Sequence, residues 1–105
     1  MEPVAREILL SLWKIHILHH AAERAVYGQW MLTELREHGY DVSPGTLYPI
    51  LRRMERFGWL KVVGEAGDNP RARRSYRITR EGRRVLKLVR RQLAGLGTEL
   101  EPSKR

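Results

Sequence analysis

The stretch SPGTLYPILRRMERFG, residues 43–58, decides the fold. Ser43 is a favourable helix N-cap, and Pro44 falls at the first helical position, where its missing N–H costs no hydrogen bond. Four apolar residues then follow the i, i+3, i+4, i+7 spacing of one helix face, namely Leu47, Ile50, Leu51 and Met54. The pattern predicts a helix over residues 44–57 that ends at a glycine. Because Pro49 removes one hydrogen bond within this helix, we expect its first turn to be tight or bent.

Two further helices are predicted before this stretch, over residues 4–22 and 29–38. The second is followed by Gly39, which suits the left-handed conformation that often closes a helix. The first is apolar on two faces, so it must be covered both by its own domain and by another surface. One face comprises Val4, Ile8, Leu12, Ile15, His19 and Ala22, and the other comprises Leu9, Trp13 and Ile17.

After residue 58, apolar and polar residues first alternate as in strands, and the apolar residues then return to a helical spacing. Residues 59–65 and 73–79 alternate as strands around the turn-forming residues 66–70, which predicts a β-hairpin. Thr79 would cap a last helix, whose apolar residues recur three and four positions apart, as in a coiled-coil seam. The seam comprises Leu86, Val89, Leu93, Leu96 and Leu100.

The predicted order is helix, helix, helix, strand, strand, helix. We therefore predict a mainly α fold with a small β-hairpin, the layout of a winged helix-turn-helix. Residues 1–79 would form the winged domain, residues 80–100 a C-terminal dimerisation helix and residues 101–105 a flexible tail. The first and last helices both carry apolar faces that need a partner, which predicts a homodimer. The expected dimerisation residues are Ile8, Leu12, Ile15, Leu86, Val89, Leu93 and Leu96.

Composition narrows the functional classes. The chain has 105 residues, the size of one domain, and no cysteine, which excludes a disulfide scaffold, a thiolate zinc finger and a cysteine nucleophile. Its longest apolar run, residues 8–18, is interrupted by Lys14 and His16 and is too short to span a bilayer. We expect a cytoplasmic protein without membrane contact. No phosphate-binding loop, nucleophile elbow or paired-carboxylate motif occurs, so we expect neither an enzyme nor a cofactor.

The positive charge is concentrated in one part of the chain. The net charge is +8, with residues 1–42 at −2 and residues 43–105 at +10. Sixteen of the twenty basic residues are arginine, which binds phosphate and guanine in a bidentate manner. A solvated basic surface would explain this composition alone. Together with the predicted fold, the excess of positive charge in residues 43–105 favours double-stranded DNA as the partner.

The expected DNA contacts lie on two elements. The helix over residues 44–57 would enter the major groove, where Thr46 could reach a base edge and short neighbouring residues would allow close approach. The hairpin would follow the DNA backbone or enter the adjacent minor groove. The expected contact residues are Ser43, Gly45, Thr46, Tyr48, Pro49, Arg52, Arg53, Arg71, Arg73 and Arg74. A symmetric dimer would present two such helices about 34–36 Å apart, which predicts an inverted-repeat operator.

A set of short motifs spread over residues 4–95 points to one family. They are Tyr27-Gly28, residues 43–49 with Leu51 and Arg52, Glu55, residues 58–60, residues 74–79, and Glu81-Gly82. Together these motifs resemble the PadR family of bacterial transcriptional regulators, and the run over residues 43–49 is the most specific. The resemblance implies a homodimeric regulator, usually a repressor, whose winged domain binds DNA and whose single C-terminal helix dimerises. Some members of the family release DNA when a small aromatic or planar effector binds at the dimer interface.

Two other functions stay open for the same sequence. A basic winged-helix protein could bind RNA or associate with the ribosome, which a comparison of duplex DNA with structured RNA would reveal. Alternatively, a winged-helix module could bind only protein, in which case removal of the hairpin arginines would leave partner binding intact.

Two weaker features lie on the first helix. His16 and His20 could offer two metal ligands from one helix face. His19 and Glu23 could offer another two, but a closed site would need ligands from elsewhere. We therefore expect no metal and assign the histidines to packing and polar contacts. Trp13 would either pack in the core or line an aromatic effector pocket between subunits.

Overall fold

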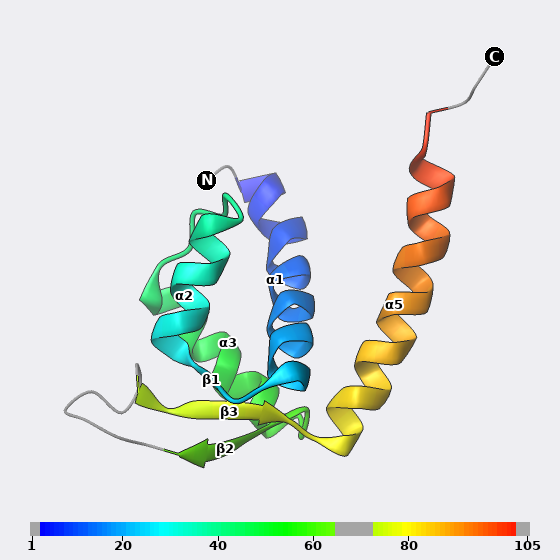
Figure 1. Cartoon of the computed structure of the whole chain (residues 1–105). Helices are drawn as coiled ribbons and strands as arrows, with labels where there is room; N and C mark the ends of the chain where they lie inside the picture. The colour runs from blue at the N-terminus through cyan, green and yellow to red at the C-terminus, as the bar shows by residue number, and fades with distance from the viewer. Residues whose placement is uncertain (1–2, 65–72, 103–105) are drawn as a thin grey trace.

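The computed structural model describes residues 3–64 and 73–102 and shows helices on one side of a small sheet (Figure 1). In chain order the elements are α1 (Pro3–Glu23), β1 (Val26–Tyr27), α2 (Gly28–Glu37), α3 (Pro44–Arg56), β2 (Leu60–Gly64), β3 (Ser75–Ile78) and α5 (Arg80–Leu100). Helices α1, α2 and α3 group together above the sheet, and α5 rises beside α1 from the end of β3. The predicted mainly α, winged layout is confirmed, with one strand added.

The sheet is antiparallel and has the strand order β1-β3-β2. Strands β2 and β3 form the predicted hairpin, in which Leu60 pairs with Ile78 and Lys61 pairs with Arg77. The predicted turn at residues 66–70 lies outside the described residues. Strand β1 was not predicted, because two residues are too few to show an alternating pattern, yet it pairs with the start of β3.

The predicted helix ends are largely confirmed. Gly39 and Gly58 follow α2 and α3 with φ angles of +88° and +82°, a left-handed backbone that glycine adopts without steric cost. Thr79 caps α5, and its hydroxyl accepts a hydrogen bond of 2.9 Å from the Gly82 N–H. The same threonine donates its backbone N–H to the Trp59 carbonyl oxygen at 2.9 Å, so the cap also ties α5 to the start of the hairpin.

Helix α3 begins differently from the expectation in one respect. Ser43 occupies the N-cap position, but its hydroxyl lies 3.2 Å from Thr46 Oγ1 and makes no side-chain cap to a backbone N–H. The Ser43 carbonyl accepts hydrogen bonds from the N–H groups of Thr46 and Leu47, at 3.1 and 3.0 Å. The first of these bonds spans three residues and the second spans four, a shared acceptor that is common at helix termini. The helix then continues through Pro49 without interruption.

The core lies between α1, the helix-turn-helix pair α2–α3, and the sheet. Helix α1 contributes Trp13, Ile17, Leu18 and Ala21, none of which is more than 1% exposed. The predicted stripe of α3 is buried in full, and it comprises Leu47, Ile50, Leu51 and Met54. Tyr76 and Ile78 close the core from β3. Burial of this stripe turns the opposite face of α3 outward.

Leu86, which was predicted at the dimerisation surface, lies in this core, and the structure decides between the two alternatives for Trp13. Leu86 is 3% exposed and packs inside the subunit, so it does not belong to a dimerisation surface. Trp13 is fully buried, so it is a core residue and does not line a pocket between subunits. The error at Leu86 arises because periodicity identifies an apolar position but not the neighbour that covers it.

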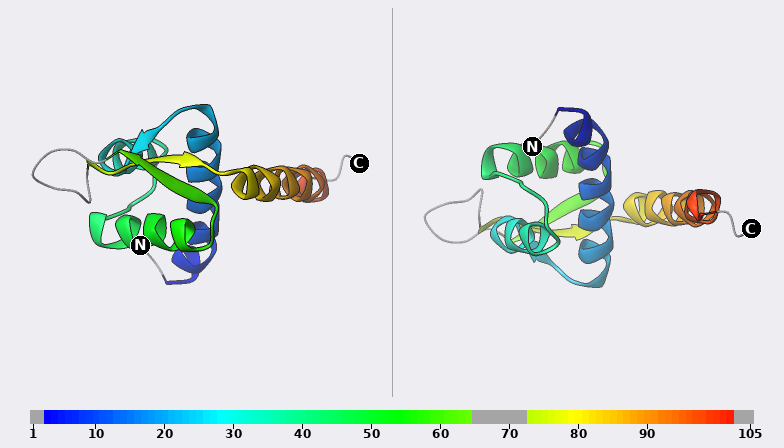
Figure 2. Two further views of the ribbon diagram at one scale, coloured as in Figure 1. Left: turned by 90° about the horizontal axis from the view of Figure 1, so that it is seen from below. Right: turned by 90° about the horizontal axis from the view of Figure 1, so that it is seen from above.

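Beyond Leu86, α5 leaves the core and projects away from the rest of the chain (Figure 2). Every residue from 91 to 100 is exposed. Large apolar side chains are among the exposed residues of α1 and α5, namely Val4, Ile8, Leu88, Leu93, Leu96 and Leu100. Within residues 3–64 and 73–102, none of the helices combines the length and apolarity that a bilayer span requires.

The junction between α5 and the hairpin generates a stability prediction. A Cβ at position 82 would overlap the Trp59 carbonyl oxygen and lie 2.7 Å from Ile78 Cγ1, so Gly82→Ala forces the backbone apart. We expect this variant to lower the free energy of unfolding by about 1–3 kcal/mol, although alanine is the better helix former. Gly95→Ala in the same helix meets nothing within 4 Å and should raise the free energy of unfolding by about 0.5–1 kcal/mol. Urea denaturation at one protein concentration measures both changes, and equal signs would contradict the expectation.

Candidate nucleic-acid interface

The outward face of α3 carries most of the residues predicted to contact DNA. Ser43, Gly45, Pro49, Arg52 and Arg53 are exposed, as is the neighbouring Arg56. Thr46 and Tyr48 are half-buried, and the ring of Tyr48 packs against the core. This face therefore presents short residues at the start of the helix and three arginines along its remaining length.

The start of α3 also receives basic residues from α1 that the sequence analysis missed. The Arg6 guanidinium donates a hydrogen bond of 3.3 Å to Thr46 Oγ1. Arg6 and Lys14 line a hollow of about 260 Å³ together with Gly45, Thr46 and Arg53. A cation from another helix therefore lies directly beside the uncharged start of α3.

A sequence signal for these residues exists, but it is weak. Arg6, Leu10 and Lys14 recur every four residues, which places them along one edge of α1 next to its buried face. Nothing in the sequence states that this edge lies against α3. The contact depends on how the two helices pack, and only the structure shows it.

The hairpin contributes to the same surface through Arg74. Its side chain lines a second hollow, of about 530 Å³, together with Arg52, Glu55 and Arg56 from α3. Three guanidinium groups and one carboxylate line the hollow. Because its net charge is positive, an anion such as a phosphate would be favoured there. Arg73 is exposed two residues before β3 begins, and Arg71 lies outside the described residues.

The tyrosine beneath Arg74 contributes to the orientation of that side chain. Burial raises the pKa of the Tyr76 hydroxyl, and this effect exceeds the opposing influence of its hydrogen bond with Arg74 and of the nearby arginine charges. Tyr76 is therefore neutral at physiological pH. A buried, neutral phenol can hold the guanidinium in position without cancelling its charge.

A second, apolar surface lies between α1 and α5. The two helices enclose a hollow of about 290 Å³ that is lined by Leu12, Ile15, His16, Tyr40, Arg90 and Leu93, among others. Ile8 and Leu96 are exposed, while Leu12, Ile15 and Val89 are half-buried. Six of the seven predicted dimerisation residues thus retain exposed surface, and Leu86 is the exception. Trp13 is absent from this lining, in keeping with its complete burial.

Three helices and a small antiparallel sheet, with α3 turned outward beside a hairpin, define a winged helix-turn-helix protein. The sequence profile described as "Transcriptional regulator PadR-like family" matches residues 17–88, and the chain belongs to this family. It is therefore a transcriptional regulator of the PadR family, and the resemblance stated from its motifs is confirmed.

Individual relatives agree with this assignment. The chain is 48% identical over 95 residues to the transcriptional regulator Rv3488 of Mycobacterium tuberculosis. The aligned residues cover 90% of this chain and 88% of that protein. It is similar to the crystal structure of a PadR-like transcriptional regulator from Bacillus cereus, with a TM-score of 0.78, 27% identity and coverage of 90% and 92% of the two chains. A PadR family regulator from Eggerthella lenta gives a TM-score of 0.68 and 30% identity, with 95% of each chain covered.

Proposed function

We propose that this chain is a sequence-specific DNA-binding repressor that acts as a homodimer on an inverted-repeat operator in the cytoplasm. One observation carries the proposal. The exposed arginines of α3 line two hollows: Arg52 and Arg56 line one with Arg74 of the hairpin, and Arg53 lines the other with Arg6 at the start of α3. In a winged helix-turn-helix protein such a helix lies in the major groove of duplex DNA, and neighbouring basic residues contact phosphates.

The roles of the individual residues follow from their positions. The start of α3 would enter the major groove, with Thr46 close to a base edge and Ser43, Gly45 and Pro49 allowing close approach. Arg52 and Arg53 would hold phosphates, and the Tyr48 hydroxyl could donate to another. The hairpin residues Arg71, Arg73 and Arg74 would follow the backbone toward the adjacent minor groove.

The dimer would form through the apolar surfaces of α1 and α5. Their apolar side chains are exposed to solvent. A second copy of the chain would bury them, because it presents the same apolar surface by symmetry. Two α3 helices about 34–36 Å apart would then read the two halves of an inverted repeat. The hollow between α1 and α5 is apolar with His16 and Arg90 at its edge, so it suits a small aromatic effector that releases the DNA.

Selection of genomic fragments by the purified protein tests the proposal as a whole. We expect the bound fragments to share one inverted repeat whose half-sites are centred about 10 base pairs apart. Equal affinity for structured RNA of the same length would support an RNA-binding function instead. Failure to bind any duplex at low salt would contradict DNA binding altogether.

The phosphate contacts make a quantitative prediction. Arg52→Ala and Arg73→Ala should each weaken binding to all DNA sequences and reduce the slope of log affinity against log salt concentration by about one unit. Lys87→Ala removes the same charge from an exposed position on α5 and should leave the slope unchanged. Fluorescence anisotropy over a range of salt concentrations measures the slopes. A slope equal to that of the wild type would reject the phosphate role.

Thr46 is expected to act on sequence choice. Thr46→Ala removes the hydroxyl and methyl groups closest to the groove, so base preference at one half-site position should change by about 1–3 kcal/mol. Affinities for operators substituted at each position measure this effect. An equal loss of affinity on every sequence would show that Thr46 positions Arg6 and Ser43, its two hydrogen-bond partners, and does not read a base.

The dimer surface can be tested with matched charges. Leu96→Glu places a carboxylate in the apolar seam of α5 and should raise the dimer dissociation constant about tenfold or more. Val63→Glu adds the same charge at a residue of nearly equal exposure, 47% against 48%, on the outer face of β2, and should have no effect. Sedimentation equilibrium measures both. A wild-type chain that is monomeric at every concentration would contradict the proposed dimer.

A further inference from the structure

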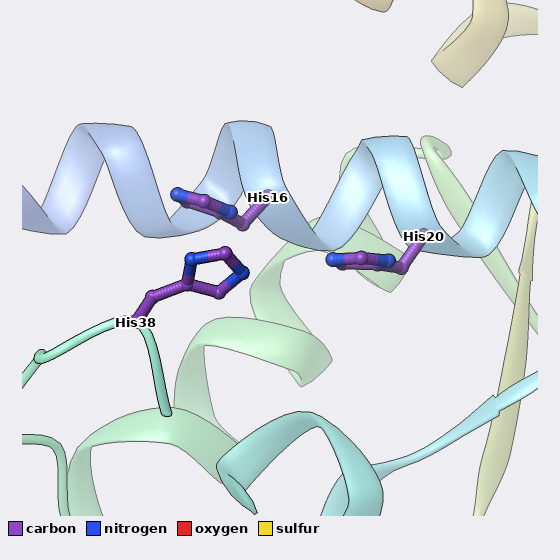
Figure 3. A group of neighbouring side chains, drawn as sticks. All are labelled: His16, His20 and His38. Atoms are coloured by element: carbon purple, nitrogen blue, oxygen red, sulfur yellow. The ribbon is translucent and has the colours of Figure 1, made fainter. Parts of the chain in front are cut away.

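We propose that His16, His20 and His38, together with Glu34, form a binding site for one divalent late transition-metal ion such as Zn²⁺, between α1 and the end of α2. Figure 3 shows the three imidazoles, with His16 and His20 descending from α1 and His38 reaching up from the residue that follows α2. The site does not depend on DNA binding, and its test needs no DNA.

The geometry of the cluster is close to that of a metal site. One ligand nitrogen from each of the three histidines lies within 4.8 Å of the others. The ring centroids of His16 and His38 are 4.9 Å apart. Ligand atoms around a tetrahedral zinc ion are about 3.3 Å apart, given zinc–nitrogen distances of about 2.0–2.1 Å. To bind one ion, the nitrogens would have to approach one another by up to about 1.5 Å through rotation of the side chains.

A carboxylate stands at the same place. Glu34 Oε1 lies 3.3 Å from His38 Nε2 and 3.6 Å from His20 Nε2. Both distances are close to the ligand spacing of a tetrahedral site, so Glu34 is placed to add a carboxylate oxygen beside His20 and His38. The sequence places only His16 and His20 together on one face of α1, and the structure adds Glu34 from α2 and His38 from the residue that follows α2.

One buried nitrogen of the cluster has no hydrogen-bond partner. The Nδ1 atom of His20 makes no hydrogen bond within the described residues. Buried polar atoms are usually paired, and coordination of an ion would give this atom a partner.

The surroundings also orient the ligands. His16 Nε2 lies 3.1 Å from the Tyr40 hydroxyl, a hydrogen bond that fixes the ring in the manner of an outer-sphere partner. Imidazole and carboxylate ligands without any thiolate select Zn²⁺, Co²⁺, Ni²⁺ or Cu²⁺ over softer ions. The ligands are therefore of intermediate softness and suit a late divalent transition-metal ion.

A second grouping shares His20 but is a weaker candidate. His19, His20 and Glu23 also bring three ligand atoms within 4.8 Å of one another. However, Arg90 Nη2 lies 3.1 Å from His19 Nδ1, which places a cation beside that ligand. Glu23 is 61% exposed, so water competes with its coordination. His19 therefore provides the matched control for the proposed site.

Titration of the chelator-treated full chain with Zn²⁺ tests the proposal, using calorimetry and competition with a chromogenic chelator. We expect one ion per chain, and Co²⁺ should give the visible absorption bands of a tetrahedral site. His16→Gln and His38→Gln should each weaken Zn²⁺ binding at least about tenfold, whereas His19→Gln should not. Binding that is lost only in His19→Gln, binding unchanged in His38→Gln, or no saturable binding by the wild type would each overturn the proposal.

Thermal unfolding supplies the control for folding. The His38 side chain is 48% exposed, so His38→Gln should unfold at nearly the wild-type temperature in the absence of metal. Added Zn²⁺ should raise the unfolding temperature of the wild type and of His19→Gln but not that of His38→Gln, since the ion binds the folded state. If His16→Gln fails to fold, the His38→Gln and His19→Gln pair decides the question alone. An equal rise in all variants would contradict the assigned ligands.

Discussion

Burial of one face of α3 is the constraint on which the rest of the structure depends. The four apolar residues of its stripe are taken up by the core, so the opposite face can only point outward. Close packing of this kind leaves little rotational freedom to the helix, because each buried side chain occupies a shaped space between α1, α2 and the sheet. The hydrophobic effect thereby sets the direction of Arg52 and Arg53, although neither residue belongs to the core.

The parts of the fold with strong local signals could be predicted from the sequence. Pro44 at the first helical position, an unbroken apolar stripe and Gly58 in a left-handed conformation together define α3 within one residue at its end. The hairpin and the Thr79 cap were predicted for the same reason, since turn chemistry and alternation are local properties. Strand β1 was not predicted, because two residues are too few to show an alternating pattern. Its place in the sheet comes from its hydrogen-bonded pairing with β3.

The candidate sites were predicted less completely, because each combines residues that are distant in the chain. Arg6 reaches Thr46 across forty positions, and His38 meets His16 across the space between two helices. Leu86 shows the converse, since a regular seam assigned it to a partner subunit while the subunit's own core covers it. Periodicity describes which residues share a face of one helix, and the neighbour of that face is decided by tertiary packing.

The anchoring of α5 at one end has a mechanical consequence. Thr79 and Leu86 hold its base against the domain and Leu93 still lines the hollow beside α1, whereas every residue from 94 to 100 is exposed. A helix of 21 residues is about 31 Å long, so a tilt of about 10° at the base moves the tip by about 5 Å. The helix is thus a lever arm with its pivot at the hairpin junction. Two domains joined through such arms would convert a small rearrangement near the pivot into a large change in their separation.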